Sequence, residues 1–122
     1  MINAATTVLV VEDEPLVRMA IVDHLIDEGF VVLEAANADE AVAILVTNLT
    51  IHIMFTDIDM PGGTDGLKLA AAVRDRWPPI KIVVTSGHRA IAAGDLPAEA
   101  QFFSKPYSPD TIVNTFRQLM GG

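Results

Sequence analysis

The chain has 122 residues, of which 51% are hydrophobic and 20% charged, so a single domain over residues 1–122 with one substantial core is expected. It contains no cysteine, which excludes a disulfide framework, a thiol nucleophile and thiolate zinc ligands. The net charge of −8 disfavours direct binding to nucleic acid or to an anionic membrane, because both are negatively charged.

The sequence also lacks the usual membrane and export signals. No apolar stretch reaches the ~20 residues that span a bilayer, and the first residues lack the basic and apolar pattern of a signal peptide. We therefore expect a soluble cytoplasmic protein.

The first predicted strand is the β-branched run 6–11, and a helix follows it. Pro15 suits the first turn of that helix, where its missing N–H costs nothing. One face of the helix is apolar and is expected to be buried. It comprises Leu16, Val17, Ala20, Ile21 and Leu25. Gly29 is placed to end the helix.

The second strand is expected over 30–35 and the third over 51–57, with a helix between them. Asn37 and Glu40 have the spacing of a capping box, so this helix is expected to begin there. The third run is rich in β-branched residues and largely apolar up to its last residue, Asp57. Such a run is typical of a strand that is buried on both faces.

The glycine-rich loop 61–66 leads into a third helix, which Pro78 helps to stop. Strands are then expected over 80–85 and 102–104. The segment 89–100 between them contains glycine and proline and predicts only a short or broken fourth helix.

The last helix is expected to start at Ser108 and to bury one apolar face. That face comprises Ile112, Val113, Phe116, Leu119 and Met120. Strands that alternate with helices indicate βαβ units and hence a parallel sheet. The pattern fits a doubly wound, flavodoxin-like α/β fold whose five parallel strands have the order 2-1-3-4-5, with helices on both faces.

Polar side chains follow four of the predicted strands. In this strand order the first, third, fourth and fifth strands are consecutive neighbours. Their carboxyl ends carry Glu12 and Asp13, then Asp57, then Ser86, then Lys105. Neighbouring strands lie ~4.8 Å apart, so these side chains can meet in the crevice where open α/β sheets bind ligands.

The residue types at this edge indicate phosphoryl transfer. Carboxylates gathered in one crevice repel one another, and oxygen ligands without imidazole or thiolate suit Mg²⁺ or Mn²⁺. With such a cation, Asp57 can act as a nucleophile and form an acyl phosphate. Lys105 and Ser86 would each bind one phosphoryl oxygen.

Several segments, in this order and spacing, resemble one known family. They are Val10-Val11-Glu12-Asp13-Glu14, Asp57 with Met60-Pro61 and Asp65-Gly66, Thr85-Ser86-Gly87-His88, and Phe103-Ser104-Lys105-Pro106-Tyr107. Over essentially its whole length the chain resembles a response-regulator receiver domain of two-component signalling, of the single-domain, chemotaxis-regulator-like kind.

The resemblance implies roles for the acidic residues. Asp57 would be the phosphoacceptor and Asp13 a direct metal ligand, with Glu12 acting through water. The backbone carbonyl of Asp59 would complete the metal's protein ligands. The Asp59 side chain is an extra acid beside the metal and a departure from the commonest pattern of the family.

The resemblance also implies roles for residues on the fourth and fifth strands. Ser86 would be the switch hydroxyl, with Thr85 as a nearby competitor for that role. Lys105 would be the phosphoryl-binding lysine, and the peptide bond between Lys105 and Pro106 is expected to be cis.

For two further residues, Phe102 and His88, the sequence allows two interpretations each. Phe102 is either a core residue or the family's rotating aromatic switch. His88 lies in the loop near the site and either contacts metal or water there or is simply exposed. The weak fourth helix falls on the family's usual output and dimer surface, so the standard dimer is not assumed.

A receiver would take a phosphoryl group from a phosphohistidine of a histidine kinase or a histidine phosphotransfer protein. The added charge, with Mg²⁺ present, would switch a surface that binds an unidentified downstream protein. The chain would catalyse its own phosphorylation and dephosphorylation, but it is not expected to turn over an external substrate. No direct contact with nucleic acid or a membrane is expected.

Two other functions compete with this interpretation. Asp57-Ile58-Asp59 looks like the Asp-x-Asp signature of haloacid-dehalogenase-type phosphatases, with Asp59 as general acid. That family places the signature on its first strand, whereas here it follows the third. A receiver fold used only for binding is the other alternative, and the complete set of acids, hydroxyl and lysine argues against it.

Overall fold

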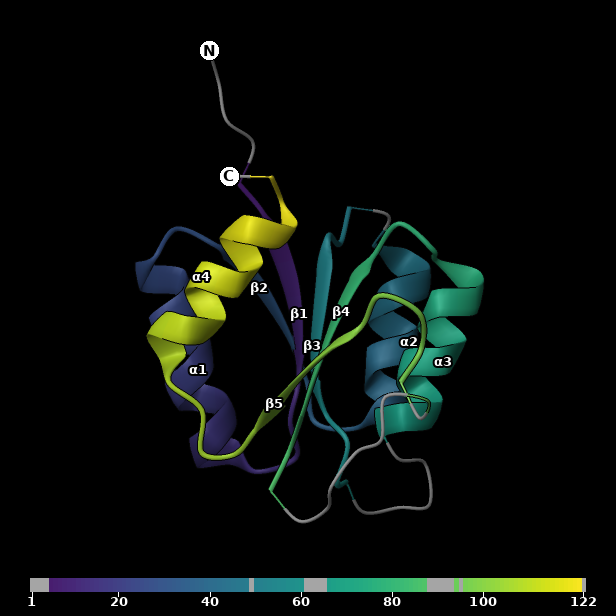
Figure 1. Ribbon diagram of the computed structural model, residues 1–122, viewed down its shortest axis with the longest axis horizontal. Helices are drawn as coiled ribbons and strands as arrows, with labels where there is room; N and C mark the ends of the chain where they lie inside the picture. The colour runs from purple at the N-terminus through teal and green to yellow at the C-terminus, as the bar shows by residue number, and fades with distance from the viewer. Residues whose placement is uncertain (1–4, 49, 61–65, 88–93, 95, 122) are drawn as a thin grey trace.

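A five-stranded parallel sheet forms the middle layer of the structure (Figure 1). This computed structural model describes residues 5–48, 50–60, 66–87, 94 and 96–121. The strands are β1 (Thr7–Val11), β2 (Val31–Ala35), β3 (Ile53–Asp57), β4 (Lys81–Ser86) and β5 (Gln101–Ser104). Their order is β2-β1-β3-β4-β5, which confirms the predicted doubly wound α/β fold.

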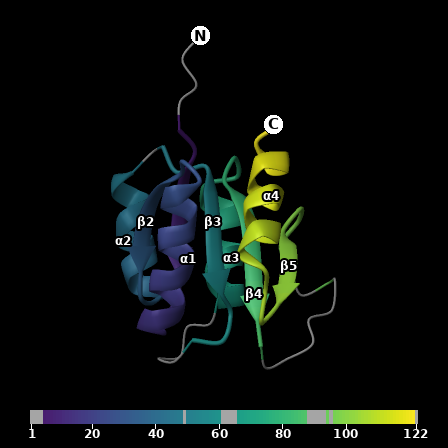
Figure 2. The same ribbon diagram turned by 90° about the vertical axis from the view of Figure 1, so that its left-hand side faces the viewer.

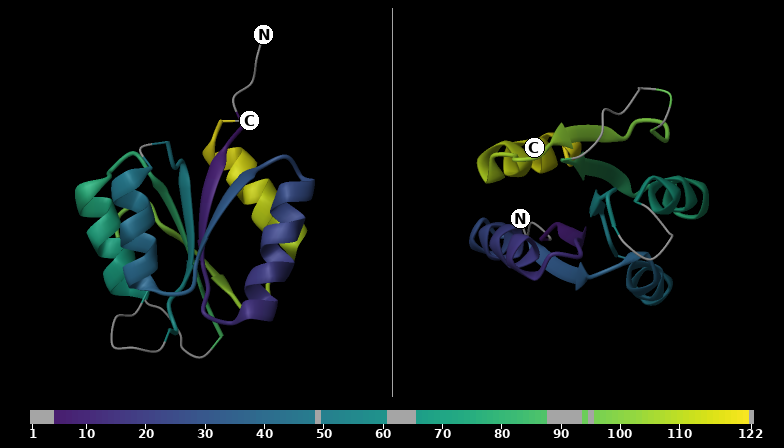
Figure 3. Two further views of the ribbon diagram at one scale, coloured as in Figure 1. Left: turned by 180° about the vertical axis from the view of Figure 1, so that it is seen from behind. Right: turned by 90° about the horizontal axis from the view of Figure 1, so that it is seen from below.

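Helices cover both faces of the sheet. Those in the described residues are α1 (Pro15–Asp27), α2 (Ala38–Thr47), α3 (Gly66–Arg76) and α4 (Pro109–Leu119). Figure 2 looks onto the face covered by α1 and α4, and the view from below in Figure 3 shows α2 and α3 on the opposite face. None of these helices is long and apolar enough to cross a membrane. The expected short or broken helix at 89–100 lies largely outside the described residues.

The local signals for helix ends act as predicted at α1 and α2. Helix α1 begins at Pro15, and Gly29 follows its end with a φ of 96°, a conformation that favours glycine. At α2, the Oδ1 of Asn37 accepts a hydrogen bond from the backbone N–H of Glu40 at 2.9 Å. The Glu40 carboxylate in turn accepts one from the backbone N–H of Ala36 at 2.8 Å. The first turn of α2 is therefore closed by its own side chains.

Apolar residues form one cluster on each face of the sheet. All five residues of β3 are buried, as its continuous apolar run predicts. Between the sheet, α1 and α4, the Phe116 ring packs edge-on against Phe30 and Phe55, with centroid distances of 5.8 and 5.6 Å. Apolar side chains therefore pack against the sheet on both faces and help to position its strand ends.

Two expectations about buried helix faces are wrong. Leu16 is 79% exposed and Ala20 is also exposed, whereas Ile21 and Val22 pack inward from α1. Met120, expected to face inward, is 40% exposed just after α4. The centre of the predicted α1 face is confirmed, because Ile21 and Leu25 are buried and Val17 is partly buried. Helix α1 has apolar residues around most of its circumference, so the predicted face was drawn too wide.

Candidate functional site

An acidic cluster lies at the carboxyl edge of the sheet, which is the end far from the end of α4 in Figure 1. Glu12 and Asp13 directly follow β1, and Asp57 is the last residue of the neighbouring strand β3. One carboxylate oxygen from each of the three residues lies within 4.8 Å of the others. Glu12 and Asp57 are only 4% and 5% exposed, whereas Asp13 is partly exposed. Parallel pairing of the two strands is what brings the three acids together.

Lys105 supplies a positive charge to this cluster. It follows β5, and its Nζ donates hydrogen bonds to Glu12 Oε1 at 2.9 Å and to Asp57 Oδ2 at 3.0 Å. The Lys105 backbone N–H donates to the carbonyl of Ser86 at 2.9 Å, which continues the pairing of β4 with β5. The peptide bond from Lys105 to Pro106 is cis.

Burial and these contacts shift the pKa values of the cluster. Burial raises the pKa of Glu12, although the hydrogen bonds from Lys105 and from the backbone N–H of Glu14 oppose this. Burial alone would lower the pKa of Lys105, but its hydrogen bonds with Glu12 and Asp57 outweigh that effect and raise the pKa above its ordinary value. Lys105 therefore stays protonated, and its ammonium pairs with two of the three carboxyl groups in the cluster, those of Glu12 and Asp57.

The Asp57 carboxylate is held on both of its oxygens. Oδ2 contacts the lysine ammonium, and Oδ1 accepts a hydrogen bond from the backbone N–H of Asp59 at 3.0 Å. The backbone N–H of Ile58 donates to the carbonyl of Thr85 at 3.0 Å, so the chain stays paired with β4 just past Asp57. A Cβ at Gly66 would lie 2.2 Å from the Asp57 carbonyl oxygen, so only glycine fits there.

Ser86 is hydrogen-bonded to a different carboxylate. Its Oγ donates to Asp59 Oδ2 at 2.5 Å, and Ser86 itself is only 2% exposed. The sequence predicts a backbone role and an extra acid at Asp59, but it gives no sign of this side-chain contact. Thr85, the alternative hydroxyl, is buried and pairs with Asp57 in the register of β3 and β4.

The remaining predicted site residues lie apart from the acidic cluster or cannot be placed. Phe102 on β5 is partly buried against the apolar cluster beneath α2 and α3, and its rotation as a switch stays a prediction. His88 lies outside the described residues, as does Asp65.

Sequence reasoning missed Arg18, which links α1 to the strand ends. Its Nη1 donates to the carbonyl of Glu12 at 2.7 Å, and its Nε donates to Glu34 Oε1 at 3.3 Å. The guanidinium therefore holds the backbone at Glu12 in place through the Glu12 carbonyl and not through a carboxylate of the acidic cluster. The sequence feature that could have indicated this role is a basic residue in the first turn of the helix that follows Glu12 and Asp13.

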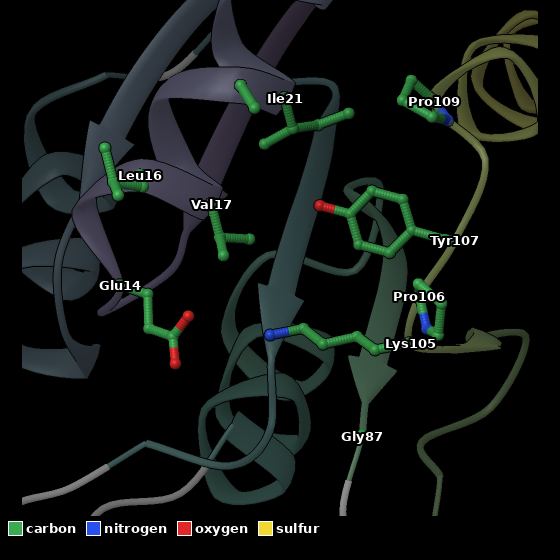
Figure 4. Close-up of a pocket in the computed structure, with 10 residues that line it drawn as sticks. Glu14, Leu16, Val17, Ile21, Gly87, Lys105, Pro106, Tyr107 and Pro109 are labelled. Atoms are coloured by element: carbon green, nitrogen blue, oxygen red, sulfur yellow. The ribbon is translucent and has the colours of Figure 1, made fainter.

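A groove of about 610 Å³ opens beside the acidic cluster, between α1 and the chain that follows β5 (Figure 4). Val17 and Ile21 line one wall, and Pro106 and Tyr107 line the other. The Lys105 side chain extends into the space between these walls, so the groove and the acidic cluster share it.

Tyr107 is the second residue that sequence reasoning missed. Its ring packs edge-on against Phe55, with a centroid distance of 5.4 Å. Burial, and then the negative charge of Glu12, raise the pKa of Tyr107 to about 12. The phenol is therefore neutral near pH 7 and presents an uncharged wall to the groove.

The response regulator receiver domain family matches residues 8–117, and the chain belongs to this family. The hydrogenase transcriptional regulatory protein HoxA of Cupriavidus necator is 37% identical and aligns with 98% of this chain. The sensor kinase CckA of Brucella abortus is 36% identical and also aligns with 98%. The chain spans only 25% and 13% of the lengths of these two relatives.

Solved structures agree with this assignment. A response regulator receiver protein from Sinorhizobium medicae superposes with a TM-score of 0.89 at 27% identity, covering 97% of this chain and 96% of the other. The receiver domain of the hybrid histidine kinase CckA gives a TM-score of 0.78 at 29% identity, with coverages of 93% and 98%. These findings support a phosphoacceptor receiver of two-component signalling, and they do not support the haloacid-dehalogenase alternative.

Proposed function

We propose that Asp57 accepts a phosphoryl group from a phosphohistidine of a histidine kinase or a histidine phosphotransfer protein. The new charge then switches a surface that binds a downstream protein. The observation that carries the proposal is the Lys105 ammonium, which bridges Glu12 and Asp57 at 2.9 and 3.0 Å within a buried acidic cluster. A phosphoryl group needs such a positive charge at the carboxylate that receives it.

The described side chains support the following transfer. A carboxylate oxygen of Asp57 attacks the phosphorus while the P–N bond to the donor imidazole breaks, and the electron pair of that bond remains on the imidazole. Lys105 moves its hydrogen bonds from the carboxylates to an oxygen of the incoming group. Water later hydrolyses the acyl phosphate, which restores the carboxylate and releases inorganic phosphate.

The acidic cluster fits a hard divalent cation, Mg²⁺ or Mn²⁺, because all of its donors are oxygens and its carboxylates outnumber its one ammonium. Asp13 and Asp57 would hold the cation directly, and Glu12 would hold it through water. The backbone carbonyl of Asp59 would supply a further ligand. When bound, the cation would offset negative charge on the phosphoryl oxygens.

Ser86 would donate its hydroxyl to the phosphoryl group, with Thr85 as the alternative donor, and Phe102 would respond by changing its packing. Asp57 is the central nucleophile of the described site, and we infer that the chain catalyses its own phosphorylation and dephosphorylation without turning over an external substrate. Phosphohistidine donors and Mg²⁺ are available in the cytoplasm, where we place the protein. The charge of −8 argues for protein partners rather than nucleic acid or membranes.

The groove beside Lys105 is the surface on which we place the phosphodonor. A donor imidazole must approach Asp57 from outside, so the donor protein has to rest on the residues around it. Leu16 and Met19 are 79% and 56% exposed on α1, and Leu16 also lines the groove. Because they are three residues apart, they share one side of the helix and can pack against a donor helix.

Phosphorylation at Asp57 is tested with acetyl phosphate and Mg²⁺. Intact-mass measurement should show close to one phosphoryl group per chain in the wild type. The Asp57→Asn variant should take up none, because an amide oxygen is not a nucleophile of this kind. Asp75→Asn, at an exposed acid on α3, is the matched control and should behave as the wild type. An unmodified wild type, or uptake by Asp57→Asn, would refute the proposal.

Docking of the donor is tested by comparing phosphorylation by a protein donor, which must dock, with phosphorylation by acetyl phosphate, which need not. Leu16→Glu should slow transfer from a purified phosphohistidine donor by about tenfold, the effect of losing one well-packed interface residue. Phosphorylation by acetyl phosphate should not change, since that small donor needs no docking surface. Ile26→Glu is the control, because Ile26 is also 53% exposed on α1 but lies nearly three turns further along. Equal effects of the two substitutions would contradict this placement.

A further inference from the structure

The hydroxyl of Ser86 is already engaged in the structure. Its Oγ donates to Asp59 Oδ2 at 2.5 Å, within the range of a hydroxyl bound to a carboxylate. Ser86 is buried and its carbonyl is tied to the backbone N–H of Lys105, so its backbone is held at the end of β4. A change of partner by this hydroxyl therefore requires the Ser86 side chain to give up its hydrogen bond to Asp59.

The backbone also fixes the position of Asp59. Its N–H donates to Asp57 Oδ1 at 3.0 Å, and the N–H of the preceding Ile58 donates to the carbonyl of Thr85 at 3.0 Å. Asp59 and Ser86 therefore face each other where the pairing of β3 with β4 continues past the last strand residue. The contact therefore joins the segment just after β3 to the last residue of the neighbouring strand β4.

We propose that Asp59 is a positioning residue that holds the Ser86 hydroxyl in the unphosphorylated protein and competes with the phosphoryl group for it. The inference rests on the proposed function, because it requires a phosphoryl group on Asp57. A hydroxyl has one proton to donate, so Ser86 must leave Asp59 before it can donate to a phosphoryl oxygen. The Asp59–Ser86 hydrogen bond thus stabilises the resting arrangement against the phosphorylated one.

The competition between Asp59 and the phosphoryl group for the Ser86 hydroxyl can be measured as a change in an equilibrium constant. A hydrogen bond to a charged group changes an equilibrium by about tenfold or more. Removing the Asp59 carboxylate should therefore favour the arrangement in which Ser86 contacts the phosphoryl group. It also removes a negative charge near that group, which favours phosphoryl binding whether or not Ser86 is present. A double-mutant cycle separates these two effects.

The first measurement is the affinity for beryllofluoride, used with Mg²⁺ as a mimic of the phosphoryl group, in the full chain. We compare the wild type, Asp59→Ala, Ser86→Ala and the double variant. Asp59→Ala should strengthen binding about tenfold more when Ser86 is present than in the Ser86→Ala background. Asp59→Asn should give an intermediate effect, because its amide oxygen is a weaker acceptor. Equal effects of Asp59→Ala in both backgrounds would overturn the competition.

The second measurement uses urea unfolding of the same four proteins without Mg²⁺ or beryllofluoride. The two substitutions should be coupled by about tenfold in the unfolding equilibrium constant, since each removes one partner of the same hydrogen bond. Additive effects would overturn the resting Asp59–Ser86 contact. A wild type that binds no beryllofluoride but shows this coupling would refute the proposed function and the competition, while leaving the resting contact established.

Discussion

Lys105 reaches its two carboxylate partners across 93 and 48 residues of sequence. Glu12 and Asp57 are almost completely buried, and a buried carboxylate without a partner is costly by several kcal/mol. The ammonium reduces this cost in the resting protein, and it is also the group that a phosphoryl oxygen requires. We therefore infer that the same side chain serves both the stability of the fold and the proposed phosphoryl transfer.

Tyr107 allows the electrostatics of the site to be measured, because it is the only tyrosine in the chain. Burial, and then the charge of Glu12, raise its pKa from 10.0 to about 12. A phenol whose folded pKa is raised contributes stability fully below pH 10, and that contribution is lost as the pH rises towards 12. We expect the phenolate absorbance to titrate near pH 12 in the folded protein and near pH 10 in urea.

Two checks accompany this titration. Circular dichroism must show that the protein is still folded through the titration range. Glu12→Gln removes the nearby negative charge and should lower the Tyr107 midpoint from that of the wild type. A folded wild type that titrates at the ordinary pH of a free phenol would contradict the burial of this side chain.

At the scale of elements, α1 contributes to two different surfaces. Ile21 and Val22 on its inner side pack in the core, whereas Leu16 and Met19 on its outer side are exposed, and Leu16 lines the groove. Arg18 lies on the inner side of α1, near its start, and ties the helix to the end of β1 through the Glu12 carbonyl. A movement of α1 would therefore change the shape of the groove and also the position of Glu12 in the acidic cluster.

The start of α2 gives a prediction about stability at this scale. Asn37→Ala removes the acceptor for the backbone N–H of Glu40, and it should lower the free energy of unfolding by about 1 kcal/mol. Asn37→Asp keeps an acceptor oxygen and should retain most of the stability. Urea unfolding monitored by circular dichroism measures both variants. An Asn37→Ala variant as stable as the wild type would show that the cap contributes nothing to the fold.

At the scale of the whole molecule, the net charge is −8, and three of the sixteen acidic residues gather in the acidic cluster. A cation that binds only the folded chain stabilises it by mass action. At ~100 times its dissociation constant, Mg²⁺ should add about 2.7 kcal/mol to the free energy of unfolding. A rise in the thermal midpoint that is reversed by a chelator would show this.

Variants locate the Mg²⁺ effect within the molecule. Asp13→Asn should remove most of the stabilisation, because Asp13 is the partly exposed member of the cluster and a proposed direct ligand. Asp75→Asn removes the same charge on α3 and should leave the effect intact. Equal loss in the two variants would indicate a diffuse electrostatic response in place of a defined site.

The sequence alone determined the sheet order, the element positions to within a few residues, and the set of polar strand ends. These features follow from local spacing and from one general rule, that parallel strands end at a shared edge. That is why Glu12, Asp13, Asp57 and Lys105 could be grouped before the structure was known.

Only the tertiary structure decided which way individual side chains turn. Leu16 points outward, Tyr107 closes the groove, and the Ser86 hydroxyl meets Asp59. Apolar periodicity cannot set the edges of a buried face when a helix is apolar on several sides. A hydroxyl's partner depends on a register between strands that is set by packing far along the chain, and no local pattern encodes it.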